Sequence, residues 1–393
     1  MSRGNRRRIN SKEKSQVFEI FLLIGKIMKK IIILVLVCIL FSGCGIATVN
    51  NAVYAPENQP VVEETEKRVS FYGVGDNLIH NSVFWQADKY KDGPDFDFKP
   101  MYECVADDIK SADISYINQE TIIGGTELGL SSYPLFNSPQ EVSRDMIDLG
   151  FDVFSHATNH VFDKGEKGLS NTYYFYSDKD VIFTGIHKKG EENIKTMEKN
   201  GIKIAFLNYT YLTNGLSAPK DSQFYVSLKD TEKMTNDIKR AKELADFVVM
   251  FLHWGEENQT TPNQMQKDDA KLFADAGCDV IIGTHPHTIQ PVEFVGDTLV
   301  VYSLGNYISA QKNHKNLVGG TIKFDFVLKS DSKRIENVSF RPVVNHYNYG
   351  YSNIKIIPFD EYSPDLASQH GAGITYEYIN NLIEKVGVND LIP

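Results

Sequence analysis

Short apolar runs alternate with stretches of helical periodicity along most of the chain. Extended apolar runs predict strands at residues 69–74, 114–117, 151–154, 181–183, 202–209, 247–252 and 280–282. Helical periodicity predicts helices at residues 100–111, 139–150, 165–178, 231–245 and 262–276. Ser138 is expected to cap the second of these helices, with Pro139 at its first position and Gly150 at its end. Strands that alternate with helices build βα units, so the pattern predicts an α/β domain.

The pattern changes after Val292. Strands are expected at residues 293–295, 298–302, 321–328 and 338–344, the first two joined as a hairpin by Gly296-Asp297. Apolar and polar residues alternate well in the third of these strands. These consecutive antiparallel strands suggest a second sheet, and residues 373–387 are predicted to form an amphipathic helix.

The N-terminal region contains one apolar run, residues 31–41, which is too short for a comfortable membrane span. Two lysines precede this run and Ser42-Gly43-Cys44 follows it, an order that is typical of a secretory signal. The end of the segment resembles a bacterial lipobox, with Cys44 as the residue to be lipidated. Residues 1–44 are therefore expected to be an extension and a lipoprotein signal peptide, with either Met1 or Met28 as the start. An uncleaved N-terminal anchor is the alternative, and it also predicts an extracytoplasmic protein.

Residues 45–67 are polar, acidic and contain two prolines, which predicts a flexible tether. The globular domain is expected at residues 68–393, with a motif-bearing core at 69–308 and antiparallel strands and a helix at 309–393. On this division, the mature domain would be held at the extracytoplasmic face of the membrane through lipidated Cys44.

The charge differs sharply between the two parts of the chain. Residues 1–44 hold 9 of the 41 Lys and Arg residues and 2 of the 51 Asp and Glu residues, a net charge of +7. The rest of the chain therefore holds 32 basic and 49 acidic residues, a net charge of −17. Such an acidic body argues against nucleic-acid binding. An anionic substrate would need a local positive site, such as a metal ion.

Polar residues with metal-binding side chains follow several of the predicted strands. They are Asp76 and His80, Asn118 and Glu120, the group His156, Asn159, His160 and Asp163, the pair His253 and Glu256, and the pair His285 and His287. Functional groups of open α/β sheets gather beyond the carboxyl ends of the strands. In His285-Pro286-His287, alternate residues of an extended segment would point the same way, so both imidazoles could face one point.

Carboxylate, amide oxygen and imidazole together form the ligand set of a site for Mn²⁺, Fe²⁺ or Zn²⁺. Individually, each residue also has a structural interpretation: Asp76 as a turn residue, Asn159 as a helix cap, His253 as part of a packed core pair. Their joint occurrence at several strand ends favours a metal site that holds one or two ions. No G-x-S-x-G, P-loop or G-x-G-x-x-G sequence competes with this interpretation.

Six segments carry a family resemblance. In chain order they are FYGVGD (71–76), NQET (118–121), SHATNHVFDKG (155–165), FLHWGEE (251–257), GCDVIIGTHPHTIQPVE (277–293) and VYSLGNYI (301–308). Together they resemble the bacterial CapA family of poly-γ-glutamate capsule biosynthesis proteins, which is related to the calcineurin-like metallophosphoesterases. The resemblance runs from about residue 69 to about residue 308.

The resemblance implies a metallophosphatase-like β-sandwich of two mixed sheets flanked by helices. It implies metal ligands at Asp76, Glu120, Asn159, His253, His285 and His287. It assigns His160 to protonation of a leaving group or to steadying the transition state, and Asp163 of the same NH-x-x-D-x-G pattern is the second catalytic candidate. Metallophosphoesterases usually open with Asp-x-His, whereas Asp76 is followed by Asn77 and Leu78, so the nearest imidazole is that of His80.

Two classes of function follow from the resemblance. In the first, the protein is a surface hydrolase or transferase that acts on an ester, a phosphoester or a γ-glutamyl amide, either in capsule synthesis or as a phosphoesterase unrelated to capsule. In the second, it is a non-catalytic accessory subunit that helps to assemble, export or anchor an anionic polymer. The expected partners are the membrane, the membrane subunits of a polymer synthase, and the polymer itself.

Overall fold

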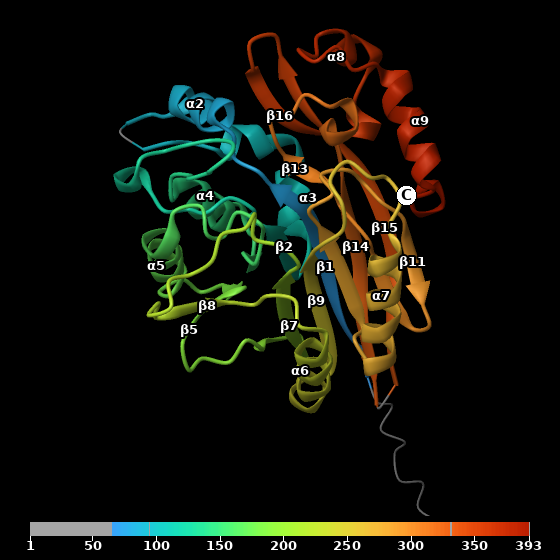
Figure 1. Ribbon diagram of the computed structural model, residues 1–393. Helices are drawn as coiled ribbons and strands as arrows, with labels where there is room; N and C mark the ends of the chain where they lie inside the picture. Colours follow the sequence, from blue (N-terminus) through green and yellow to red (C-terminus); the bar gives the residue numbers. More distant parts are fainter. Residues whose placement is uncertain (1–64, 94, 331, 393) are drawn as a thin grey trace, which may run out of the picture. The chain divides into compact units, whose positions relative to one another are not determined.

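The structure is a computed structural model that describes residues 65–93, 95–330 and 332–392 (Figure 1). The predicted signal peptide at 1–44 and nearly all of the predicted tether at 45–67 lie outside these residues. Within the described part of the chain, no helix is both long and apolar enough to cross a membrane.

Two mixed β-sheets form the framework. The first is ordered β16 (Ser352–Pro358), β15 (Ser332–Asn348), β14 (Val318–Lys329), β1 (Lys67–Asn77), β2 (Ile114–Asn118), β3 (Val153–Ser155) and β4 (Ile182–Thr184), with β13 (Asn306–Ile308) paired to β1. The second is ordered β11 (Val292–Val295), β12 (Thr298–Val301), β10 (Val280–Thr284), β9 (Phe247–His253), β7 (Ile202–Thr210) and β6 (Lys195–Lys199). A small third sheet pairs β5 (Ile186–Lys188) with β8 (Phe224–Val226). The predicted α/β class with two mixed sheets flanked by helices is confirmed.

Two predicted strands belong to a different sheet from the one expected. β14 and β15, predicted as part of a separate second sheet, instead extend the first sheet, because β14 pairs antiparallel with β1 along Lys67–Val74. The other edge of β1 pairs parallel with β2 (Figure 1). The apolar face of β14, with Ile322, Phe324 and Phe326, thereby joins the same core as β1.

Strand alternation explains how the two sheets pack. In β7, Ile204 and Phe206 belong to the core that both large sheets share, whereas Ala205 and Leu207 belong to a second core on the opposite face. Helices α6 (Thr231–Leu244) and α7 (Gln264–Ala276) lie beside the strands of the second sheet (Figure 1) and contribute apolar residues to that second core.

The remaining helices cover the first sheet and the small sheet. They are α2 (Asn81–Tyr90), α3 (Ala106–Ser111), α4 (Glu141–Leu149), α5 (Gly165–Tyr176), α8 (Pro364–Ser368) and α9 (Tyr376–Val386), and a 3₁₀ turn at Lys99–Val105 precedes α3. Gly150 ends α4 with a left-handed φ of 111°, as predicted. The predicted cap is wrong, because Gln140 occupies the N-cap and the Ser138 hydroxyl instead lies 2.8 Å from that of Thr121. α7 begins two residues later than expected, after the Asn263 capping box.

Candidate metal centre

The carboxyl ends of the parallel strands bring the predicted site residues together. Asp76 at the end of β1 pairs in register with Asn118 of β2, and the Asn118 amide donates to Asp76 Oδ1 over 2.8 Å. In the second sheet, His253 at the end of β9 pairs with Thr284 at the end of β10. The two sheets are in face-to-face contact close to these ends, where Tyr116 and Phe251 stack with ring centroids 3.8 Å apart.

A fully buried group lies at the centre of the cluster. Asp76, Glu120 and His287 each offer one ligand atom, and these atoms lie within 4.8 Å of one another. His287 Nδ1 is 3.4 Å from Asp76 Oδ2, and His287 Nε2 is 3.7 Å from Glu120 Oε1. Two carboxylates and one imidazole therefore converge where water is excluded.

Glu120 is the least satisfied member of this group. Both of its carboxylate oxygens are buried, and neither has a hydrogen-bond partner within the described part of the chain. Burial raises the pKa of Glu120 well above its ordinary value, although the His287 imidazole opposes the shift. Burial alone would lower the pKa of His287, but the carboxylates of Glu120 and Asp76 outweigh it and raise that pKa to about 10. A divalent cation bound here would offset the cost of burying these acceptor atoms without partners. The donor set therefore fits such an ion.

The other three predicted ligands are His253, which lies near Glu120, and Asn159 and His285, which lie beside His253. His253 Nε2 lies 3.0 Å from Asn159 Oδ1 and 4.0 Å from Glu120 Oε1. The opposite ring nitrogen of His253 lies 3.0 Å from the Thr284 hydroxyl, which fixes the orientation of the ring. The ring of His285 is centred 4.8 Å from that of His253. The structure thus gathers all six predicted metal ligands into one cluster; that they hold a metal stays a prediction.

The His-Pro-His segment has a different backbone conformation from the predicted one. β10 ends at Thr284, and His285 and His287 have positive φ values of 94° and 56°. The segment is therefore a strained turn rather than an extended tip, and the prediction of strand-like alternation was wrong. Two contacts hold the turn: the His285 N–H donates to Asp76 Oδ2 over 3.2 Å, and the Asn258 N–H donates to the Pro286 carbonyl over 2.8 Å.

His160 and Asp163 form a dyad beside the cluster. His160 Nδ1 lies 2.7 Å from Asp163 Oδ2, and that oxygen also accepts the Phe136 N–H over 2.6 Å. The Phe136 ring meets the His160 ring edge-on, with centroids 4.6 Å apart. Neither dyad residue belongs to the close ligand groups found among the described residues.

His80 and His156 also come from the predicted windows, and neither belongs to the close ligand groups of the described residues. His80 Nδ1 accepts the Ala310 N–H over 3.3 Å and lies 3.2 Å from the Leu78 carbonyl. His156 is buried among aromatic rings, 5.8 Å from Tyr176 and 5.6 Å from Phe183 between centroids. The contacts of His80 and His156 are thus those of structural residues, although both histidines follow the end of a strand.

Sequence reasoning missed two residues of the cluster. Asn306 Oδ1 lies 3.0 Å from His287 Nδ1, and Glu257 offers a carboxylate oxygen within 4.8 Å of ligand atoms of His285 and His287. Both residues lie within motif segments of the sequence: Asn306 ends Ser-Leu-Gly-Asn, and Glu257 follows Glu256 directly. Their position in these segments was the sequence signal that could have identified them as candidate site residues.

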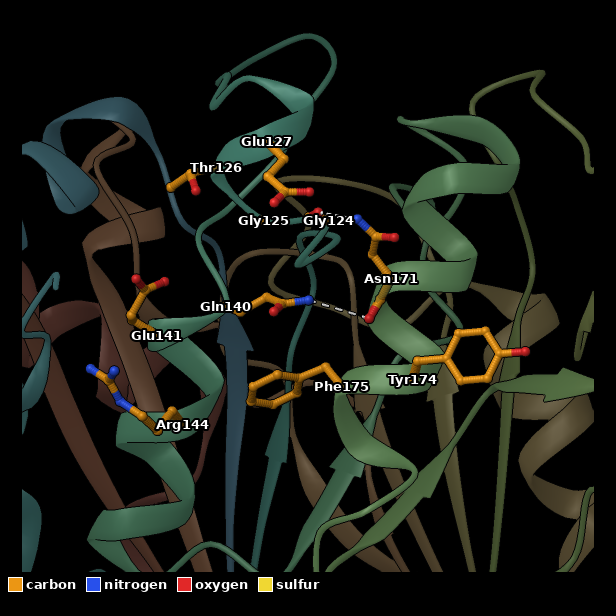
Figure 2. A pocket seen from close by; sticks show the side chains of 10 residues that line it. All are labelled: Gly124, Gly125, Thr126, Glu127, Gln140, Glu141, Arg144, Asn171, Tyr174 and Phe175. Atoms are coloured by element: carbon orange, nitrogen blue, oxygen red, sulfur yellow. Dashed lines mark hydrogen bonds between the residues drawn. The ribbon is translucent and has the colours of Figure 1, made fainter.

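A separate hollow of about 600 Å³ lies between α4, α5 and the segment Gly124–Glu127. Figure 2 shows the Gln140 side chain extending towards α5, where its Nε2 donates to the Asn171 backbone carbonyl over 3.3 Å. None of the clustered ligands lines this hollow, so it is distinct from the candidate metal centre.

Comparison with known families identifies the class. Residues 70–311 match the family described as bacterial capsule synthesis protein PGA_cap, and the chain belongs to this family. This confirms the resemblance drawn from the motifs.

Two curated relatives are similar over part of their length. The PGA biosynthesis protein CapA of Bacillus subtilis strain 168 is 34% identical over 167 residues, which cover 42% of this chain and 44% of that protein. The capsule biosynthesis protein CapA of Bacillus anthracis is 32% identical over 182 residues, which cover 44% of each chain. The matched segments therefore span less than half of each relative.

Solved structures show weaker similarity. A phosphatase of Mycoplasma pneumoniae aligns with a TM-score of 0.46 and 10% identity, covering 71% of this chain and 95% of that one. The calcineurin-like phosphoesterase YfkN of Bacillus subtilis aligns with a TM-score of 0.44 and 17% identity, covering 83% of this chain and 98% of that one.

Proposed function

We propose that this protein is a divalent-metal hydrolase or transferase that acts in the synthesis, export or anchoring of an anionic capsule polymer of the poly-γ-glutamate type. The observation that carries the proposal is Glu120, whose two buried oxygens lack hydrogen-bond partners among the described residues, while its Oε1 lies 3.7 Å from His287 Nε2 and 4.0 Å from His253 Nε2. A carboxylate in this state is costly unless a cation compensates it. Membership of the PGA_cap family supports the polymer as the context of the reaction.

The residues that would hold the ion are Asp76, Glu120, Asn159, His253, His285 and His287. Oxygen and imidazole donors of this kind suit Mn²⁺, Fe²⁺ or Zn²⁺. When bound, such a cation would supply positive charge to a substrate oxygen and lower the pKa of a water molecule. In a domain whose net charge is strongly negative, this local positive charge also gives an anionic substrate a place to bind.

His160 and Asp163 would handle the proton. Asp163 Oδ2, 2.7 Å from His160 Nδ1, would accept a hydrogen bond from this nitrogen and so orient the ring. With both ring nitrogens protonated, the Nε2–H of His160 could donate a proton to a leaving oxygen or nitrogen. Phe136 fixes the pair from both sides, through its N–H to Asp163 and its ring against His160.

The setting of the reaction is part of the proposal. The lipobox-like Cys44 would attach the domain to the extracytoplasmic face of the membrane, with residues 45–67 as the tether. Membrane subunits of a polymer synthase would be its partners there, and the growing anionic polymer would be presented to the metal centre.

Metal analysis and two hydrolysis assays test the proposal. The purified protein, loaded with Mn²⁺, would be given a generic phosphodiester and a γ-glutamyl peptide, alongside Glu120→Gln and the matched control Glu127→Gln at an exposed glutamate. We expect bound metal and hydrolysis of one substrate in the wild type and in Glu127→Gln, with both lost in Glu120→Gln. A metal-loaded protein that cleaves neither substrate but is required for polymer production in cells would favour the accessory function instead.

A further inference from the structure

Glu257 is an exposed residue that faces a buried pair of imidazoles. One of its carboxylate oxygens lies within 4.8 Å of ligand atoms of His285 and His287, and these three residues form a second close group beside Asp76, Glu120 and His287. Within the described part of the chain, no hydrogen bond or ion pair engages the Glu257 carboxylate. The neighbouring Glu256 differs, because its Oε1 lies 3.5 Å from the side-chain nitrogen of Asn263.

His285 supplies an independent observation. Its Nδ1 is buried and has no hydrogen-bond partner among the described residues, although the residue is only 4% exposed. A buried ring nitrogen without a partner is uncommon in native structures and requires an explanation. A ligand bound between this ring and the Glu257 carboxylate would provide one.

The backbone around Glu257 is held in place from two directions. The Asn258 N–H donates to the Pro286 carbonyl over 2.8 Å, which ties this loop directly to the histidine turn. On its other side, Asn258 Oδ1 accepts from Asn316 Nδ2 over 2.8 Å, and the Asn258 carbonyl accepts from Lys315 Nζ over 2.5 Å. Glu257 is thus fixed beside the histidine turn rather than carried on an unanchored surface loop.

We propose that Glu257 is a direct ligand of a divalent cation, which it holds together with His285 and His287 at the solvent side of the metal centre. The inference rests on the proposed function, and it adds a seventh ligand to the set named above. It also makes the centre asymmetric, because Asp76 and Glu120 bind from the buried side while Glu257 binds from the exposed side. Because the Glu257 carboxylate is in contact with water, it loses little of its hydration when it binds the ion.

Metal binding to the full-length protein tests the inference without any assay of activity. Mn²⁺ and Co²⁺ would be titrated into metal-free wild type, Glu257→Gln and the matched control Glu256→Gln, with stoichiometry from elemental analysis and affinity from calorimetry. The visible absorption of Co²⁺ adds a readout of ligand number and type. We expect Glu257→Gln to lose one equivalent of metal or to bind at least about 10-fold more weakly, with an altered Co²⁺ spectrum. Glu256→Gln should match the wild type.

The outcomes separate the inference from the proposed function. Unchanged stoichiometry, affinity and Co²⁺ spectrum in Glu257→Gln would overturn the inference while leaving the metal centre intact. An equal loss in Glu256→Gln would also overturn it, because the effect would then be one of general surface charge. Metal binding that depends on Glu257, in a protein that hydrolyses neither test substrate, would support the ligand and count against the hydrolase. A wild type that binds no divalent cation would contradict both.

Discussion

His160 Nδ1 lies 2.7 Å from Asp163 Oδ2, and the two side chains come from one turn of the chain that follows β3. The contact leaves Nε2 as the ring nitrogen that can serve a substrate. The same turn carries Asn159, whose amide oxygen faces His253 instead. In the proposed function, the adjacent residues Asn159 and His160 would serve two different tasks, metal binding and proton transfer.

Substitutions in the dyad should separate these tasks. We expect His160→Ala and Asp163→Asn to keep their metal content and melting temperature near those of the wild type, while the hydrolytic rate falls, roughly 10²-fold or more for His160→Ala. His287→Ala should lose metal and activity together. Metal content, melting temperature and rate measured on the same preparations would check this. If His160→Ala lost metal as His287→Ala does, His160 would be a ligand and the division of roles would be wrong.

Metal removal should destabilise the wild-type protein. A cation that binds only the folded state adds about 4 kcal/mol to the free energy of unfolding when its free concentration is about 1,000 times its Kd. A strong chelator should therefore lower the melting temperature of metal-loaded wild type. Glu120→Gln should show no such response, and it should be at least as stable as chelated wild type because a neutral amide replaces a buried carboxylate. A chelator effect of the same size in Glu120→Gln would contradict the assignment of this residue.

His156 should make the protein sensitive to acid. Complete burial lowers the pKa of His156 to about 3 from its ordinary value of 6.5. The unfolded chain therefore binds a proton that the folded chain excludes, and stability is lost as the pH falls from 6.5 towards 3. One such group contributes a slope of up to about 1.4 kcal/mol per pH unit. Urea unfolding of wild type and His156→Phe at several pH values would measure how the free energy of unfolding depends on pH. The variant should lose less stability per pH unit than the wild type. Equal pH dependence in the two proteins would refute the prediction.

Lipidation should depend on Cys44 alone. We expect Cys44→Ala to lose incorporation of labelled lipid and to leave an unprocessed or released protein. Cys38→Ala, a change within the apolar run of the same segment, should be labelled like the wild type. Fatty-acid labelling in cells followed by membrane fractionation would measure both. Wild-type labelling of Cys44→Ala would show that the lipobox assignment is wrong.

Local sequence signals determined much of the framework. Apolar runs located most strands of the α/β part, and glycines marked helix ends correctly, because Gly150 and Gly277 adopt the left-handed conformation that few other residues tolerate. The residues at strand ends also identified side chains that cluster in the structure, since the carboxyl ends of parallel strands must meet at one edge of a sheet. These features depend on neighbours in sequence or on a general rule of sheet geometry.

Only the tertiary structure decided which of those residues share a site. An apolar strand face requires a core but does not specify which one, so the pairing of β14 with β1 could not be read from its alternation. His156 and His160 stand in one segment, yet the first turns into an aromatic core and the second towards Asp163. Glu257 lies beside the histidine turn because the Asn258 N–H donates to the Pro286 carbonyl, a contact between the loops that follow β9 and β10. Such contacts arise from long-range packing, which no local pattern records.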